Sequence, residues 1–181
     1  MKPKIVLVTG GARSGKSRFA EQLLSEHGGR KFYLATMPLL DAESVERVRR
    51  HRERRAGRNW TTIEEECDLV RALRQAAAEG AGAVLVDCLT LWLNNLFYRA
   101  EKENRPFGES EAAEEARKLV ETLREQPFDS VLVINEVGLG LVPETPLGRR
   151  FRDASGRCAQ IVAEAADELY FCVAGIPRRF K

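Results

Sequence analysis

The chain alternates between short apolar runs and longer stretches with helical spacing. Runs of four or five residues without polar alternation are typical of strands buried on both faces, and they occupy residues 5–8, 32–35, 83–86, 130–134 and 169–173. Stretches with helical spacing and helix-stop signals cover residues 16–27, 41–56, 66–78, 89–99, 110–124 and 149–166. This alternation predicts an α/β fold with a mainly parallel sheet flanked by helices.

Two of the connections between these elements are long. Residues 100–109 are polar, and residues 137–148 carry three glycines and two prolines. Both are too short to link domains, and the chain shows no internal repeat, so we predict one domain over residues 1–181. Ligands of open parallel sheets bind at the carboxyl ends of the strands. Functional residues are therefore expected in the loops after the first four apolar runs.

Composition narrows the class of protein. The 181 residues are 44% hydrophobic, enough for one sizeable core. The 29 Lys and Arg nearly balance the 27 Asp and Glu, and the net charge of +2 argues against nucleic acid or membrane as an obligatory partner. No stretch approaches the ~20 apolar residues of a membrane span. The four cysteines lack C-x-x-C spacing, so we expect reduced thiols in a cytoplasmic protein.

The loop after the first predicted strand carries the clearest chemical motif. It fits G-x-x-x-x-G-K-[ST] and lies between an apolar run and a helical stretch, as a phosphate-binding loop requires. Backbone N–H groups of such a loop surround a phosphate, the lysine reaches the outer phosphates, and the final hydroxyl holds Mg²⁺. The residues are Gly10, Gly11, Ala12, Arg13, Ser14, Gly15, Lys16 and Ser17.

An acidic residue is also expected at the metal. Asp87 ends the third apolar run, where a carboxylate would reach Mg²⁺ directly or through water. The alternative is that Asp87 caps the helix that follows. Glu136, after the next run, is the rival candidate and could instead orient a substrate hydroxyl.

The most concentrated charge surrounds a single histidine. Residues 46–58 contain seven arginines and two glutamates around His51. On a helix, Arg47, Arg54 and Arg55 would flank the imidazole, and cationic neighbours favour its neutral, nucleophilic form. A solvated helix face or a nucleic-acid contact surface are the alternatives, although the run lacks aromatic residues for base stacking.

Several of these segments together resemble one family. They are the loop 9–17, the pair Ala35–Thr36, the arginine-rich helix running to Trp60, the block from Asn135 to Glu144, and residues 151–157 and 174–176. The sequence is similar to the bifunctional adenosylcobinamide kinase/adenosylcobinamide-phosphate guanylyltransferase family of cobalamin biosynthesis. The resemblance spans essentially the whole chain, and the block 135–144 is its most specific part.

The resemblance implies a P-loop NTPase of RecA-like fold that tends to form homotrimers. It implies phosphorylation of adenosylcobinamide with ATP or GTP, followed by transfer of GMP from GTP, through a guanylyl-histidine matched by His51, with release of pyrophosphate. Its nucleotide contacts would fall on the loop 10–17 and on Ala35, Thr36, Met37, Arg52, Glu53, Arg54, Arg55, Glu64 and Asp87. Glu65 is the alternative to Glu64.

The chemistry of the residues and the resemblance both point to His51 as a nucleophile. A plain kinase needs only the loop, the metal and a substrate hydroxyl, whereas nucleotidyl transfer through a covalent intermediate needs one nucleophile near the α-phosphate. Two other functions remain open on the residues alone. They are a kinase for another small metabolite and a RecA-like, nucleic-acid-stimulated ATPase.

Overall fold

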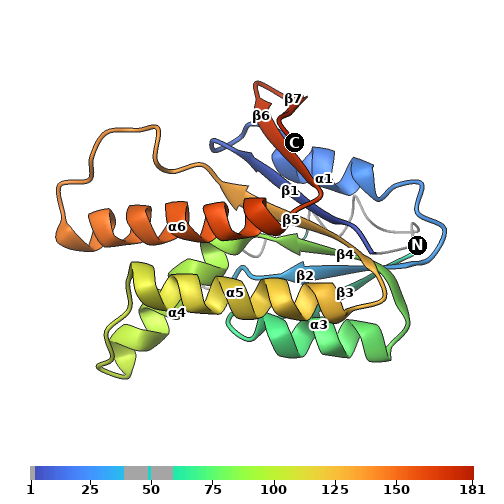
Figure 1. The fold of residues 1–181 in the computed structure, drawn as a ribbon, viewed down its shortest axis with the longest axis horizontal. Helices are drawn as coiled ribbons and strands as arrows, with labels where there is room; N and C mark the ends of the chain where they lie inside the picture. Colours follow the sequence, from blue (N-terminus) through green and yellow to red (C-terminus); the bar gives the residue numbers. More distant parts are fainter. Residues whose placement is uncertain (1–2, 39–48, 50–58) are drawn as a thin grey trace.

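A single sheet organises the chain in the computed structural model, which describes residues 3–38, 49 and 59–181. Its strands follow the order β3-β2-β4-β5-β1-β6-β7 (Figure 1). All neighbouring pairs are parallel except β6 and β7, which are antiparallel. The strands are β1 (Ile5–Gly10), β2 (Arg30–Ala35), β3 (Trp60–Glu64), β4 (Ala81–Asp87), β5 (Asp129–Asn135), β6 (Glu168–Val173) and β7 (Ile176–Arg179).

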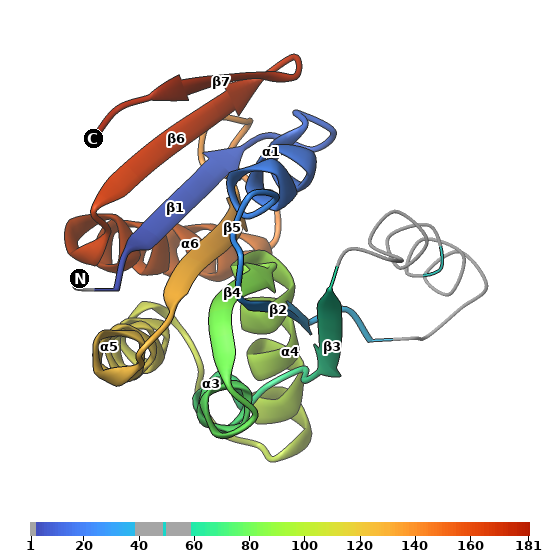
Figure 2. The same ribbon diagram turned by 90° about the vertical axis from the view of Figure 1, so that its right-hand side faces the viewer.

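Helices cover both faces of this sheet. On one face the core is completed by α3 (Leu69–Ala78), α4 (Leu89–Lys102), α5 (Glu109–Glu125) and α6 (Pro146–Ala165). On the other face, α1 (Lys16–Leu23) packs over β1, β5 and β4 (Figure 2). The predicted α/β fold with a mainly parallel sheet flanked by helices is therefore confirmed.

Both faces of the central strands are apolar, which explains the unbroken runs in the sequence. In β4, Val84 and Val86 belong to the core beneath α3, α4 and α5, while Ala83 and Leu85 face α1. All four are fully buried. A strand covered on both sides needs apolar residues at every position rather than at alternate ones.

The two edge strands were not predicted. In β3 only Ile63 is buried, and in β7 every residue is exposed or half-buried. An edge strand with one open side tolerates threonine, arginine and proline, so neither strand produces an apolar run. Because they lie at the edges of the sheet, these two strands lack the apolar run by which a buried strand is recognised in a sequence.

Several predicted helix bounds are wrong by up to four residues. The first helix ends at Leu23 instead of residue 27, and α6 begins at Pro146 instead of residue 149. Thr145 caps α6 by accepting a hydrogen bond from the Gly148 N–H, and proline fits the first helical position. The predicted helix over residues 41–56 lies outside the described residues.

The register aligns the carboxyl ends of the strands. Ala35 at the end of β2 is paired with Asp87 of β4 on one side and with Glu64 of β3 on the other. Gly10 at the end of β1 is paired with Asn135 of β5. The sheet thereby gathers predicted site residues from four separate segments at one edge, which we call the carboxyl edge. Among the described residues, no helix has the length and apolar character of a membrane span.

Candidate functional site

The predicted phosphate-binding loop connects β1 to α1 at the carboxyl edge. Gly10 has φ +149°, and a Cβ there would lie 2.5 Å from the Cys172 carbonyl oxygen. Gly15 has φ +89° and is the N-cap of α1. Both positions require glycine, because a side chain would meet strain at Gly15 and backbone at Gly10. The glycines of the motif thus serve the shape of the loop.

The turn between β6 and β7 supports the loop from one side. The Gly175 N–H donates to the Ser14 carbonyl over 2.9 Å, and a Cβ on Gly15 would come within 3.0 Å of the Gly175 Cα. No sequence pattern connects Gly175 with the loop. Only the antiparallel return of β7 brings the two segments together.

Lys16 begins α1 and lies beneath the loop. Its side chain is 8% exposed, and Nζ donates to the Gly11 carbonyl over 2.9 Å. The positive end of the α1 dipole is at the same place, and the first turn of α1 carries no acidic residue. This arrangement gives the loop a local positive potential suited to phosphate.

Two buried thiols lie within the influence of the Lys16 charge. Burial and the neighbouring Asp87 raise the pKa of the Cys88 thiol to about 11, against the lowering effect of Lys16. Burial likewise raises the pKa of Cys172, again opposed by Lys16. Both thiols therefore stay protonated near neutral pH, and neither is a thiolate nucleophile.

Asp87 ends β4, and its carboxylate is held from the neighbouring strand. The Tyr33 hydroxyl donates to Oδ2 over 2.9 Å, and Tyr33 is itself 6% exposed. The N-cap of α4 is Cys88, with no side-chain capping bond. The alternative role of Asp87 as a helix cap is therefore wrong, and its half-buried carboxylate remains available for ligand chemistry.

A polar network fixes the backbone behind Asp87. Thr36 is fully buried. Its hydroxyl donates to the Cys88 carbonyl over 2.8 Å and accepts from the Cys88 N–H over 2.7 Å. Asn95 Nδ2 donates to the carbonyls of Thr36 and Glu66 over 2.8 and 3.0 Å. The loops after β2, β3 and β4 are thus bound to one another.

The two candidate glutamates after β3 differ in their surroundings. Glu64 is exposed. Glu65 accepts hydrogen bonds from the backbone N–H groups of Cys67 and Asp68 and pairs with Arg71. Burial alone would raise the pKa of Glu65, but these partners hold it below its ordinary value. Glu65 is therefore committed to the start of α3.

Glu136 adjoins the phosphate-binding loop directly. Its N–H donates to the Gly10 carbonyl over 2.9 Å. Its carboxylate accepts from the Gly138 N–H over 2.7 Å and from the Leu139 N–H over 3.0 Å. In this arrangement Glu136 shapes the connection between β5 and α6 rather than presenting its carboxylate to an ion.

The described residues offer oxygen ligands of the kind that Mg²⁺ prefers, but only a few of them. No group of three metal-ligating side chains occurs within residues 3–38, 49 and 59–181. A carboxylate from Asp87 and a hydroxyl from Ser17 are the hard oxygen donors that Mg²⁺ prefers, and this ion usually keeps several waters and takes further ligands from substrate phosphates. The effect of Lys16 on the Cys88 thiol shows that the end of β4 lies within electrostatic reach of the loop.

Most of the arginine-rich segment lies outside the described residues. His51, Arg52, Glu53, Arg54 and Arg55 lie outside the described residues. Ala35 and Met37 lie at and just beyond the end of β2, Ala35 buried and Met37 half-buried. Among the residues that sequence reasoning missed, Tyr33 lies within a predicted strand and Asn95 within a predicted helix. No motif distinguished either from a packing residue.

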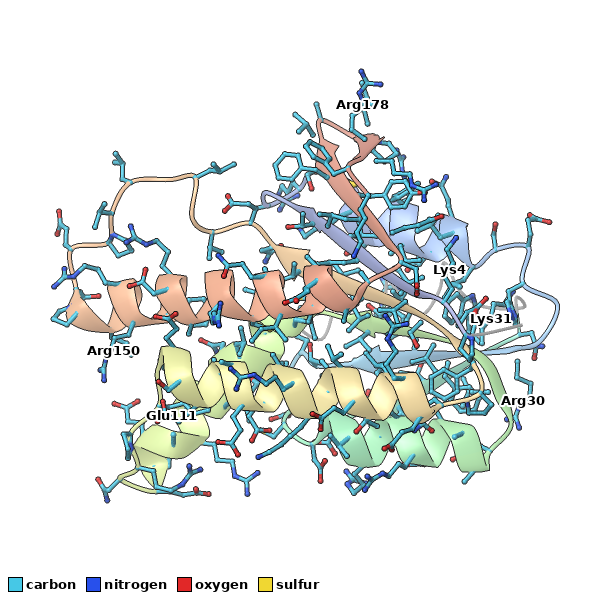
Figure 3. The ribbon with its side chains drawn as sticks, viewed as in Figure 1. Lys4, Arg30, Lys31, Glu111, Arg150 and Arg178 are labelled. Carbon is cyan, nitrogen blue, oxygen red and sulfur yellow. The ribbon has the colours of Figure 1, made fainter. Side chains whose placement is uncertain are left out.

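The basic side chains labelled in Figure 3 are spread over the molecule. Lys4, Arg30 and Lys31 lie toward the amino ends of β1 and β2, while Arg150 and Arg178 come from α6 and β7. They form no common stripe of the kind that follows a nucleic-acid backbone. Among the described residues, Lys16 and the start of α1 supply positive potential at the loop.

Comparison with known proteins gives a consistent result. Residues 6–180 match the family described as cobinamide kinase/cobinamide phosphate guanyltransferase. The bifunctional adenosylcobalamin biosynthesis protein CobP of Pseudomonas aeruginosa is 45% identical over 175 residues, which cover 97% of this chain and 96% of that protein. The bifunctional adenosylcobalamin biosynthesis protein CobU of Salmonella typhimurium is 39% identical over 184 residues, with coverage of 98% and 99%.

Proposed function

The chain belongs to the cobinamide kinase/cobinamide phosphate guanyltransferase family, and from this premise we propose how its residues carry out two successive reactions. The enzyme phosphorylates the aminopropanol hydroxyl of adenosylcobinamide and then transfers GMP from GTP to that phosphate. One domain over residues 1–181 serves both steps, with one phosphate-binding loop for both nucleotides. Its substrates are adenosylcobinamide, ATP or GTP in the first step, and GTP in the second.

In the kinase step the loop 10–17 holds the phosphates of the nucleotide. Its backbone N–H groups and the start of α1 bind the charge, and Lys16 moves from the Gly11 carbonyl to the outer phosphates. Ser17 and Asp87 would hold Mg²⁺, which when bound neutralises charge on the phosphate oxygens. The substrate hydroxyl attacks the γ-phosphate in line and gives its proton to solvent or a nearby base.

In the transfer step a histidine receives the nucleotide. A neutral His51 nitrogen attacks the α-phosphorus of GTP, the bond to the bridging oxygen breaks, and pyrophosphate leaves. The phosphate of adenosylcobinamide phosphate then attacks the same phosphorus, releasing His51 and forming adenosylcobinamide-GDP. Arg52, Arg54 and Arg55 would stabilise the charge, with Glu53, Ala35, Thr36, Met37 and Glu64 completing the nucleotide contacts.

The observation that carries this proposal is the buried position of Lys16, together with the raised pKa values of the two thiols that its charge influences. The buried ammonium beneath a glycine loop at a helix N-terminus supports a phosphate site. The thiols of Cys88 and Cys172 have raised pKa values despite the lowering effect of this ammonium. Neither therefore serves as the nucleophile of a covalent step. This supports the assignment of that step to the histidine.

The proposed assembly and location are a homotrimer in the cytoplasm. Val173, Ile176 and Phe180 are exposed apolar side chains on or beside the edge strand β7, a feature typical of surfaces that pack against another copy. All four cysteines carry free thiols, which fits a reducing compartment. Light scattering of the purified protein would report three times the 20.3 kDa chain mass for a trimer.

The two reactions should separate at the histidine. We expect His51→Ala to lose guanylyl transfer and to keep phosphorylation of adenosylcobinamide, because direct attack on the γ-phosphate needs no histidine. His27→Ala is the matched control, since His27 is the only other histidine in the chain. Transfer of GMP by a folded His51→Ala protein at the wild-type rate would disprove the covalent step.

A further inference from the structure

The connection between β5 and α6 presents apolar side chains to solvent. Its central part, residues 137–143, is called the apolar loop below. Leu139, Leu141 and Val142 are 80%, 95% and 63% exposed. Single exposed apolar residues are common in folded proteins, but three within four positions contribute nothing to the core and point to a ligand or a partner.

The apolar loop is anchored at both ends. At its start, the Glu136 carboxylate accepts hydrogen bonds from the Gly138 and Leu139 N–H groups. At its end, Arg149 Nη1 donates to the carbonyls of Pro143 and Glu144 over 3.0 and 2.7 Å. Two charged side chains therefore hold the backbone in a shape that keeps its apolar side chains outside the core.

The start of the apolar loop adjoins the phosphate-binding loop. β5 is the direct neighbour of β1, and the Glu136 N–H donates to the Gly10 carbonyl over 2.9 Å. In Figure 1 the connection leaves β5 at the carboxyl edge and arches outward before it enters α6. A ligand seated on the apolar loop would therefore lie on the same side of the sheet as the phosphate-binding loop.

The chemistry of the loop favours a ligand that presents apolar groups and uncharged polar groups. Residues 137–143 contain no charged side chain, although 31% of the whole chain is charged. A Cβ on Gly140 would meet nothing within 4 Å, so the loop backbone is open to a broad surface. Phosphates and nucleic acid find no charge to pair with there. The corrin ring of adenosylcobinamide, which carries methyl groups and uncharged amides, matches this surface.

We propose that the apolar loop is the docking surface for the corrin ring of adenosylcobinamide. The ring rests on Leu139, Leu141 and Val142, while the aminopropanol arm extends along the carboxyl edge toward the nucleotide. This inference rests on the proposed function, since it takes the acceptor from that reaction. It gives the exposed side chains a role that neither the core nor the phosphate site requires.

Direct binding of adenosylcobinamide tests this proposal. Leu141→Asp is placed in the full-length protein, and corrinoid binding is measured by equilibrium dialysis through the visible absorption of the ring. We expect affinity to fall about tenfold or more, the order expected for loss of one buried leucine contact, while GTP binding stays unchanged. Leu141→Met, which keeps an apolar side chain, should retain most of the affinity.

Tyr98→Asp is the matched control, because Tyr98 is 59% exposed and lies on α4, outside both the apolar loop and the proposed packing surface. It should bind the corrinoid as the wild type does. Corrinoid affinity unchanged in Leu141→Asp would overturn the proposal. A fall in oligomer mass in Leu141→Asp would overturn it as well, by assigning the surface to a second copy of the chain. A wild-type protein that neither binds nor phosphorylates adenosylcobinamide would instead contradict the proposed function.

Discussion

Tyr33 offers a way to test whether Asp87 acts through a metal ion. Tyr33→Phe removes only the hydroxyl that donates to Asp87 Oδ2 over 2.9 Å and keeps the edge-on contact of its ring with Trp60. A hydrogen bond to a charged group contributes about 1.5–3 kcal/mol. Because Asp87 is only half-buried, water partly replaces the lost donor, so we expect a loss near the lower bound.

Two measurements should change in Tyr33→Phe. A loss of about 1.5 kcal/mol lowers the melting temperature by roughly 3–6 °C for a chain of this size. A carboxylate that is no longer oriented also binds its ion less well, and a loss of about 1 kcal/mol raises the half-saturating Mg²⁺ concentration about fivefold. Binding of GTP in the presence of EDTA should remain as in the wild type.

Tyr170→Phe is the control for this experiment. The Tyr170 hydroxyl also donates to a carboxylate, that of Glu168, over 2.9 Å. Glu168 also pairs with Lys4, which precedes β1. The hydrogen bond between Tyr170 and Glu168 therefore lies near the amino ends of the strands, away from Asp87. Tyr170→Phe should lower stability and leave the Mg²⁺ dependence unchanged. If Tyr33→Phe melts at a lower temperature but requires no more Mg²⁺ than Tyr170→Phe, Asp87 does not act through the ion.

Two further substitutions test the parts of the phosphate site. Lys16→Ala should reduce both the kinase and the transferase rates by roughly a hundredfold or more, and a folded variant that keeps either rate within a few-fold of wild type would require a second nucleotide site. Asp87→Asn should weaken nucleotide binding in Mg²⁺ more than in EDTA, whereas Glu136→Gln should not; a reversed pattern in these titrations would exchange the roles of the two acids.

The buried centre of the fold could be predicted from sequence because its signal is strong. Strands β1, β2, β4 and β5 are covered on both faces, so consecutive positions in the middle of each strand are apolar. The phosphate-binding loop was equally visible, since its glycines and Lys16 have fixed positions relative to a strand and a helix. In both cases the residues that the tertiary structure requires also form a pattern that can be recognised in the local sequence.

The contacts that position the site could not be predicted. The Tyr33 hydroxyl meets Asp87 across a strand pair, and the Gly175 N–H meets the Ser14 carbonyl across the β6–β7 turn. Such contacts depend on register and on an edge strand without an apolar run. The choice between metal ligand and helix cap for Asp87 was open in the sequence, because a strand end and a helix start share the same residues.

In the proposed mechanism one phosphate-binding loop serves both reactions, and His51 carries GMP between them. The decisive experiment is to incubate the pure protein with GTP labelled in the α-phosphate and to analyse the intact chain and its peptides by mass spectrometry. We expect one GMP per chain on His51, through a phosphoramidate that is labile in acid and stable in alkali. Recovery of the label on any other residue, or no labelled chain at all, would contradict it.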